Sequence, residues 1–116
     1  MSDECMFCQI VRGEIYSERI YENDNFFSIF DVHPKTEGHC LIISKKHFET
    51  VLDIPSISGS EFLDCVKKTA IKVLNNYCAE GFNLLMNSFE VAGQEVKHFH
   101  AHIIPRRKSD GLSVLS

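Results

Sequence analysis

The apolar positions of this chain fall into several short runs separated by polar turns. Runs of this length that are rich in branched and aromatic residues are typical of strands. The polar triplet 23–25 lies between two of them and is typical of a tight hairpin turn. The pattern therefore predicts five strands, over residues 19–22, 26–30, 40–43, 82–87 and 99–105.

One longer stretch follows a helical period instead. Its apolar residues recur every three or four positions and form one stripe: Leu63, Val66, Ala70, Val73 and Tyr77. Ser58, with Glu61 three residues later, can form a capping box at the start of this helix, and Gly81 can end it in the left-handed conformation. A second, short helix or turn is predicted over residues 6–11, ending at Gly13.

The order of these elements predicts an α+β fold. Most of the strands are joined by connections too short for a parallel crossover, which favours antiparallel pairing. The long helix must bury its apolar stripe, and one face of the sheet offers the surface for it. We expect a five-stranded antiparallel sheet with one long helix and a short N-terminal helix, in a single domain over residues 1–116.

Composition and charge narrow the classes of function. The net charge of −4 and the pI near 5.8 argue against a basic surface for nucleic acid. No apolar run approaches the roughly 20 residues that span a bilayer, and the polar N-terminus lacks the pattern of a signal peptide. The odd cysteine count favours reduced thiols and a cytoplasmic protein. Cys40, Cys65 and Cys78 lie among apolar neighbours, so we expect them to be buried.

Three histidines alternate with apolar residues in the last predicted strand. Because side chains alternate between the faces of a strand, His98, His100 and His102 are expected on one face. Three imidazoles on one face indicate either a metal ion or an anionic substrate. A catalytic metal would need carboxylates near the ring N–H groups, and Glu95 is the nearby acid. A nucleophilic imidazole would instead need groups that bind phosphate oxygens.

Candidate phosphate-binding residues lie just before these histidines. Gly93 allows backbone N–H groups to approach a phosphate, and the side-chain amides of Gln94 and Asn87 can donate hydrogen bonds. Each of them also has an ordinary structural role, as a turn residue or a strand-end cap. Their joint position favours a histidine that attacks a phosphate.

The histidine segment resembles the signature of the histidine triad (HIT) family of nucleotide-binding proteins. In that signature each of three histidines is followed by apolar residues, and residues 98–104 have the sequence HFHAHII. The resemblance extends to CMFCQI at 5–10, FDVHP at 30–34 and GHCLIISKKH at 38–47, and to Asn87 with Gly93 and Gln94. It covers almost the whole chain.

The resemblance implies a role for each histidine. His100 would attack the α-phosphorus of a purine nucleotide and form a covalent nucleotidyl-histidine. His102 and His39 would contact phosphoryl oxygens and the leaving group, a protonated imidazole offsetting the growing charge, and His98 would support His100. The implied activity is hydrolysis of adenosine 5′-phosphoramidates or similar AMP conjugates. Hydrolysis of dinucleoside polyphosphates, nucleotidyl transfer and a nucleotide-binding scaffold with little turnover stay open.

The resemblance also implies the remaining contacts to the nucleotide. Asp31 would accept hydrogen bonds from the ribose hydroxyls, although a loop cap is an equally good explanation of this residue. The apolar slot for the base would be formed by Phe7, Ile10, Ile29 and Val32. Glu95 is a departure, because the best-known phosphoramidases carry a serine there, and a glutamate can donate to a leaving nitrogen only when protonated. The preferred leaving group is therefore open.

Cys5 and Cys8 form a CxxC pair, which is half of a structural zinc site. In one branch of the family the other two ligands stand at the positions of His47 and His98. The resemblance therefore implies a closed Cys2His2 zinc site that holds the N-terminal segment to the last strand. Two incidental thiols on a short helix are the alternative. The resemblance further implies a homodimer in which two sheets join into one of ten strands.

Overall fold

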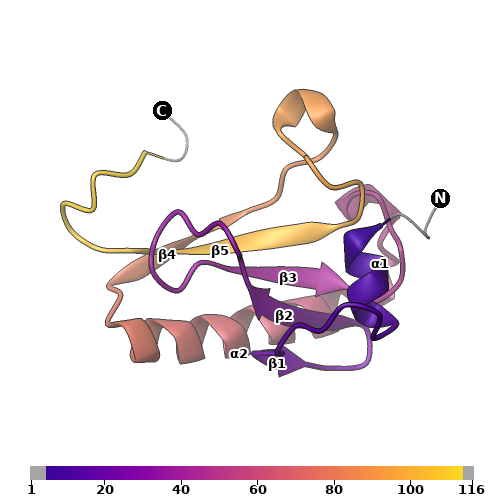
Figure 1. Ribbon diagram of the computed structural model, residues 1–116, viewed down its shortest axis with the longest axis horizontal. Helices are drawn as coiled ribbons and strands as arrows, with labels where there is room; N and C mark the ends of the chain where they lie inside the picture. Colours follow the sequence, from indigo (N-terminus) through magenta and orange to yellow (C-terminus); the bar gives the residue numbers. More distant parts are fainter. Residues whose placement is uncertain (1–4, 114–116) are drawn as a thin grey trace.

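The computed structural model describes residues 5–113 and contains a five-stranded antiparallel sheet with helices on both sides (Figure 1). The strand order across the sheet is β1-β2-β3-β5-β4. The predicted α+β class is confirmed, and all five strands are present: β1 (Tyr21–Glu22), β2 (Phe26–Phe30), β3 (Cys40–Ser44), β4 (Gly81–Leu85) and β5 (His100–Arg106).

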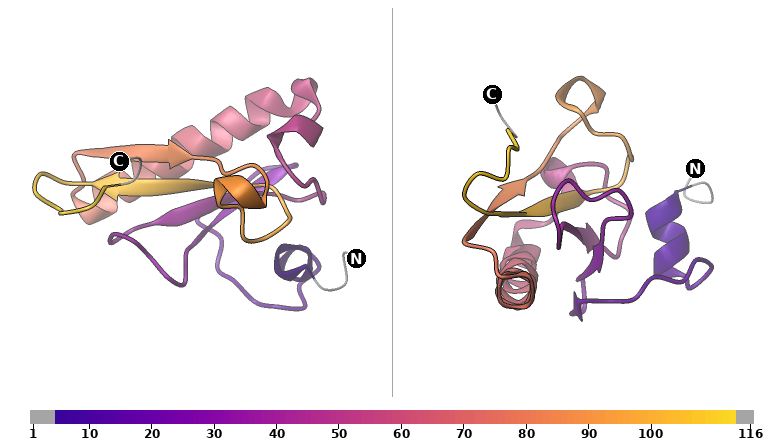
Figure 2. Two further views of the ribbon diagram at one scale, coloured as in Figure 1. Left: turned by 90° about the horizontal axis from the view of Figure 1, so that it is seen from above. Right: turned by 60° about the vertical axis from the view of Figure 1, so that its left-hand side comes forward.

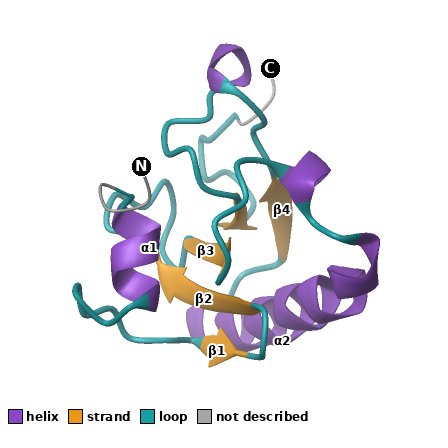
Figure 3. Ribbon diagram, turned by 90° about the vertical axis from the view of Figure 1, so that its right-hand side faces the viewer, coloured by secondary structure: helices purple, strands orange, loops and turns teal. Residues whose placement is uncertain are grey.

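Two helices lie on opposite faces of the sheet (Figure 2). α2 (Gly59–Tyr77) is the long helix expected from the apolar stripe, and α1 (Met6–Val11) is the short N-terminal helix. The connections from β3 to α2 and from β4 to β5 are long loops (Figure 3) that contain short 3-10 helices, at Val51–Asp53, Ser56–Ser58 and Glu90–Ala92. No helix among residues 5–113 is long and apolar enough to cross a membrane.

Each face of the sheet has its own hydrophobic core. The larger core packs α2 against the sheet through residues such as Val66, Val73, Ala101 and Ile103. The smaller core lies under α1, which contributes the two buried side chains Phe7 and Ile10 and the partly buried Val11. Burial of two such side chains gives about 3–6 kcal/mol before the entropy of ordering is subtracted. A helix of six residues therefore gains from a further anchor.

The register of β5 against β3 places the histidine side chains. His100 lies opposite Ile43 and His102 lies opposite Leu41, and both partners belong to the core under α1. Ala101 and Ile103, between and after the two histidines, belong to the core under α2. The predicted alternation is confirmed, and it directs the histidines of β5 to the α1 face.

Both ends of α2 differ from the prediction. Ser58 precedes the helix but makes no side-chain cap, because it already belongs to a 3-10 helix, and Glu61 instead accepts a hydrogen bond from Asn25 Nδ2. The left-handed residue after the helix is Cys78, with φ 53°, whereas Gly81 begins β4. The predicted capping box and the glycine cap are therefore wrong, since neighbouring elements take up both residues.

Two side chains that were predicted to be buried, Leu63 in α2 and Cys78 at its end, are exposed. Leu63 is 54% exposed, because the buried stripe of the helix is narrower than the apolar pattern suggested and runs through Cys65, Val66, Thr69, Ala70 and Val73. Cys78 is exposed, whereas Cys40 and Cys65 are buried as expected. A left-handed residue at a helix end lies outside the packed face, so its apolar neighbours in sequence do not bury it.

Some strand bounds also differ. β1 has two residues instead of the four expected, and β4 ends at Leu85. Asn87 therefore lies in the loop after β4. β5 begins at His100, so His98 lies in the approach to the strand rather than within it.

Gly38 brings the loop after β2 back onto the fold. Its φ is +91°, which side chains rarely adopt, and a Cβ atom there would lie 3.0 Å from side-chain atoms of both Val73 and Tyr77. The glycine thus lets the loop pass directly over the end of α2. This close approach sets the position of His39, the next residue, at the entrance to β3.

Candidate functional site

A pocket of about 510 Å³ opens on the α1 face of the sheet. Its polar wall is formed by β5, the loop after β2 and the loop before β5, through Asp31, His33, Lys35, His39, Asn87, Gly93, Glu95, His100 and His102. Its apolar wall contains the four residues expected around the base: Phe7, Ile10, Ile29 and Val32. A largely apolar cleft with a few convergent polar groups is the usual form of a small-molecule site.

The pocket also has lining residues that the sequence did not single out: Met6, Ile15, Tyr16, Ser17, Phe30, His33, Lys35, Leu41, Leu85 and Val96. Strand periodicity could have found Leu41, which lies opposite His102. Tyr16 and Lys35 lie in loops, where no periodicity predicts which way a side chain points.

The backbone holds His100 in one tautomer. Its Nδ1 lies 2.8 Å from the carbonyl oxygen of His98. A carbonyl can only accept, so Nδ1 carries the hydrogen and Nε2 of the neutral ring has a lone pair. Within residues 5–113, Nε2 has no hydrogen-bond partner. An attacking imidazole requires this arrangement.

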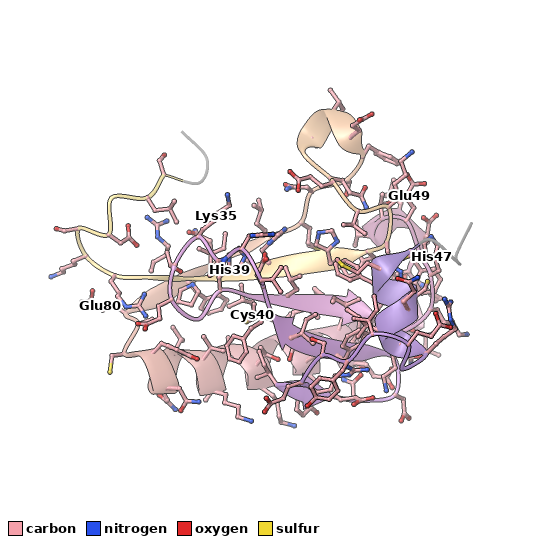
Figure 4. The ribbon with its side chains drawn as sticks, in the orientation of Figure 1. Lys35, His39, Cys40, His47, Glu49 and Glu80 are labelled. Atoms are coloured by element: carbon pink, nitrogen blue, oxygen red, sulfur yellow. The ribbon has the colours of Figure 1, made fainter. Side chains whose placement is uncertain are left out.

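A second chain of hydrogen bonds orients His39 and His102; Figure 4 shows His39 beside β5. The backbone N–H of Lys35 donates to His39 Nδ1 at 3.0 Å, so neutral His39 carries its hydrogen on Nε2. That nitrogen lies 3.0 Å from His102 Nδ1, which therefore accepts. Neutral His102 is left with an Nε2–H group, and this donor suits a phosphate oxygen.

Burial keeps both of these rings neutral in the free protein. Loss of hydration is the main cause that lowers the pKa of His102 to about 4, and it also lowers the pKa of His39. Asp31 Oδ2 lies 3.5 Å from His39 Nε2, but its charge only partly offsets the burial. In the free protein, the neutral N–H groups of these two rings are therefore the donors.

Asp31 caps a loop and also lines the pocket, so both explanations of this residue remain open to it. One carboxylate oxygen, Oδ1, accepts the backbone N–H of His33 at 2.9 Å, as a loop cap does. The residue also lines the pocket, and its other oxygen faces His39. A carboxylate has enough lone pairs to do both.

Three of the remaining predicted residues lie at the pocket wall near the triad. Gly93 has a φ of +98°, and a Cβ atom there would lie 3.4 Å from Asn87 Nδ2, so the amide rests against the glycine. Asn87, Gly93 and Glu95 all line the pocket, and Glu95 is exposed.

The side-chain amide of Gln94 is not free to bind a phosphate as predicted, because it is hydrogen-bonded within the protein. Nε2 donates to the carbonyl oxygens of Glu49 (2.6 Å) and Val96 (3.0 Å), and Oε1 accepts the N–H of Phe89 at 2.7 Å. Phe89 has φ 74° and ψ 159°, a conformation that is costly for any residue except glycine. Gln94, 6% exposed, therefore stabilises a strained loop and does not line the pocket.

A separate cluster joins α1 to the approach to β5, with ligand atoms of Cys5, Cys8, His47 and His98 within 4.8 Å of one another. His98 Nδ1 lies 3.2 Å from Cys5 Sγ, 3.5 Å from Cys8 Sγ and 3.1 Å from His47 Nδ1. Cys8 Sγ lies 3.2 Å from His47 Nδ1, and Figure 4 shows His47 beside α1. His98 is completely buried and does not line the pocket.

Comparison with known proteins agrees with this geometry: the HIT domain family matches residues 12–109. The chain belongs to the HIT domain family. Adenosine 5′-monophosphoramidase HNT1 of Candida albicans is 40% identical over 116 residues, which cover 95% of this chain and 76% of that protein. A HIT family structure from Bacillus subtilis has a TM-score of 0.90 at 35% identity and covers 97% of this chain and 81% of its own. A Zn-bound histidine triad family protein from Mycobacterium smegmatis has a TM-score of 0.84 at 36% identity, with 97% and 82% covered.

The cysteine and histidine cluster of this HIT domain fits a zinc ion. A tetrahedral ion would hold two ligand nitrogens about 3.3 Å apart and a nitrogen and a sulfur about 3.6 Å apart; the observed separations are 3.1 Å and 3.2–3.5 Å. His98 Nε2 donates to the Ser44 carbonyl at 2.7 Å, so its Nδ1 lone pair faces the cluster. Burial, with Cys5 nearby, raises the pKa of Cys8 to about 11, and a metal cation would stabilise the thiolate.

Neither of the other metal arrangements suits this HIT domain. Asp31, His39 and His102 also lie close together, but His39 Nδ1 accepts from Lys35, so its Nε2 carries a hydrogen and has no lone pair for an ion. The three histidines of the triad do not share a metal either. Among the described residues, neither group that could hold a metal includes His100.

Proposed function

We propose that this HIT domain hydrolyses nucleoside 5′-phosphoramidates and related AMP conjugates, with purine nucleotides preferred, through a covalent nucleotidyl intermediate on His100. The observation that carries the proposal is the His100 ring, whose Nδ1–H is held by the His98 carbonyl at 2.8 Å and whose Nε2 lone pair is free to react. The similarity to a protein named adenosine 5′-monophosphoramidase supports this class of substrate.

In the first step, His100 Nε2 forms a bond to the α-phosphorus as the phosphorus–nitrogen bond to the leaving amine breaks. The departing nitrogen takes up a proton, for which Glu95 in its protonated form is the candidate donor. Negative charge collects on the phosphoryl oxygens during this step. The Nε2–H of His102 is the donor that would stabilise it, and His39 holds that hydrogen in place through the 3.0 Å contact.

In the second step, water attacks the phosphorus and gives a proton to the Glu95 carboxylate left by the first step, while the bond to His100 breaks. This step releases AMP and returns the neutral ring with its hydrogen on Nδ1. Asp31 would accept hydrogen bonds from the ribose hydroxyls. The apolar residues of the pocket would contact the base, through Phe7, Ile10, Ile29 and Val32. Asn87 would donate to the phosphate. The N–H of Gly93 already donates to the Glu90 carbonyl at 2.9 Å, so Gly93 would serve this contact through its packing against Asn87, and Gln94 only through the loop it stabilises.

A second candidate is hydrolysis of conjugates whose leaving group is anionic, such as dinucleoside polyphosphates. Lys35 lines the pocket, and its positive charge contributes to the low pKa of both His39 and His102. An ammonium group that lines the pocket would favour an anionic leaving group over an amine. Glu95 lines the same pocket, and its carboxyl group would favour an amine over an anionic leaving group.

A substrate panel tests the proposal. The kcat/KM for an AMP phosphoramidate of a simple amine is expected to exceed that for a diadenosine polyphosphate by about tenfold or more. Lys35→Gln should lower the activity on the polyphosphate more than the activity on the phosphoramidate. The opposite ranking would assign the second candidate function. AMP binding without turnover of any conjugate would instead indicate a nucleotide-binding scaffold.

We further propose that the Cys5, Cys8, His47 and His98 cluster binds structural zinc. When bound, the ion supplies a cross-link between α1 and the approach to β5, and it takes no part in the reaction. The existence of a Zn-bound relative with 36% identity supports this assignment. All five cysteines are free of disulfides, which suits reduced thiols and the cytoplasmic location proposed for the single domain over residues 1–116.

A homodimer through β4 is also proposed. β4 is an edge strand, and its side chains Phe82 and Leu84 are 38% and 41% exposed. An edge strand with exposed apolar side chains can pair with another copy, which would join two sheets into one of ten strands.

Leu84→Glu should abolish this dimer, because antiparallel pairing of two copies would bring the introduced charges together in an apolar contact. Light scattering should give about twice 13.3 kDa for the wild type and the single-chain mass for the variant. Leu52→Glu is the matched control, since Leu52 is 76% exposed and lies outside β4. A wild type of single-chain mass would contradict the proposed dimer.

A further inference from the structure

Phe7 contacts two histidines that have different roles. It lies on α1 between Cys5 and Cys8 and is only 2% exposed. Its ring meets the ring of His98 edge-on, with centroids 5.6 Å apart and an angle of 86°. It meets the ring of His100 in the same manner, at 5.1 Å and 70°. One side chain therefore joins the metal cluster to the candidate nucleophile.

The ring of His100 has few other restraints. The Nδ1–H bond to the His98 carbonyl fixes the tautomer and one edge of the ring. A single hydrogen bond still allows the ring to tilt, so packing must determine where Nε2 points. The neighbouring rings are those of Phe7 and of His102, whose centroid is 5.2 Å away.

The position of Phe7 depends in turn on the cluster. A helix of six residues is too short to be stable by itself. The Sγ of Cys5 accepts the N–H of Cys8 at 3.4 Å and caps the helix. The same two cysteines lie within 3.5 Å of His98 and His47. The turn of α1 that carries Phe7 is thus fastened on both sides by ligands of the cluster.

We propose that Phe7 is a positioning residue for the nucleophile, through which the cluster of Cys5, Cys8, His47 and His98 sets the orientation of the His100 ring. The inference rests on the proposed role of His100. It adds a contact through which a structural metal site would influence the orientation of the nucleophile. Edge-to-face contacts of this kind are worth about three- to tenfold in an equilibrium. A reacting atom misplaced by about 1 Å can lose about a hundredfold in rate.

The experiment compares Phe7→Leu and Phe7→Met with Val11→Ala as the control. Leucine and methionine keep an apolar side chain of similar volume but remove the aromatic ring, and methionine fills irregular space well. Val11 lies on the same helix and packs against the same core, but it does not line the pocket. Four quantities are measured: bound zinc, the ¹⁵N and ¹H signals of the His100 ring without nucleotide, the Kd for AMP, and the rate of intermediate formation at saturating substrate.

Both Phe7 variants are expected to hold one equivalent of zinc, to shift or broaden the signals of His100, and to form the intermediate at least about threefold more slowly at saturation. Val11→Ala should keep the zinc, the Kd for AMP, the His100 signals and the saturating rate. Unchanged His100 signals in the Phe7 variants would overturn the proposal, and so would the same changes in Val11→Ala. Loss of zinc in both Phe7 variants would also overturn it, because the ring would then serve the cluster and not the nucleophile.

The ring signals keep this test separate from the proposed function. They are recorded without nucleotide, so they decide the role of Phe7 even if no conjugate is turned over. A failure on every substrate with the expected His100 shifts would end the proposed hydrolysis and leave the positioning contact intact.

Discussion

His100→Ala should bind AMP but form no covalent intermediate, and its turnover of an AMP phosphoramidate should fall by about 10⁴-fold or more. The alanine removes the Nε2 lone pair, and neither of the other two triad histidines can replace it. Neutral His102 has a hydrogen on its pocket nitrogen, and His98 is buried outside the pocket. Loss of a nucleophile typically costs several orders of magnitude, with binding left to supply the remainder.

The measurement is a rapid quench into alkali, where a phosphohistidine survives, with a conjugate labelled in its AMP portion. Wild-type protein should show a labelled chain before steady turnover begins, and His100→Ala should show none. His33→Ala is the control, since His33 is an exposed residue at the pocket rim whose contact with Asp31 is made by its backbone. Undiminished turnover in His100→Ala would rule out the proposed mechanism.

Cys8→Ser should lose the zinc ion and, with it, much of the stability of the N-terminal segment. A hydroxyl is a poor ligand for zinc, and three remaining ligands would leave the ion open to water. Zinc present at about a thousand times its Kd stabilises the folded state by about 4 kcal/mol, and the variant forfeits this amount. The free energy of unfolding is measured with zinc buffered at that level, and bound metal is measured by mass spectrometry.

Cys78→Ser is the matched control for this experiment. Cys78 is an exposed thiol at the end of α2 and lies outside the cluster, so its replacement should change neither zinc content nor stability. In wild-type protein, removal of zinc by a chelator should speed amide exchange over residues 6–11 while the amides of β5 stay protected. A Cys8→Ser protein that holds a full equivalent of zinc would refute the ligand set.

Much of this fold could be predicted from the sequence, because its elements follow local periodicities. The apolar stripe of α2, apart from Leu63, and the alternation along β5 were both confirmed, together with all five strands. The ends of the elements were predicted less well. Ser58 and Gly81 have the right chemistry for helix caps, yet Ser58 belongs to a 3-10 helix and Gly81 belongs to a strand. Such competition between neighbouring elements is decided by packing and does not appear in a local pattern.

The residues of the candidate site were also predicted in part. Family resemblance brought together the correct four residues around the metal cluster and nearly all of the polar wall of the pocket. It misplaced Gln94, because an amide beside a phosphate and an amide that braces a loop have the same sequence signal. Only the contacts of Gln94 with Glu49, Val96 and Phe89 distinguish the two.

The sequence by itself determined which elements form and which side chains are the candidates for the chemistry, since periodicity and motif are properties of nearby residues. The tertiary structure decided which ring nitrogen of each histidine carries the hydrogen. His100, His102 and His98 are chemically identical in the sequence, yet His100 carries its hydrogen on Nδ1, whereas His102 and His98 carry theirs on Nε2. The carbonyl of His98 sets that choice for His100, the N–H of Lys35 sets it for His102 through His39, and the carbonyl of Ser44 sets it for His98. Partners separated by up to tens of residues meet only in the folded chain, so the tautomer of each histidine is a property of the fold.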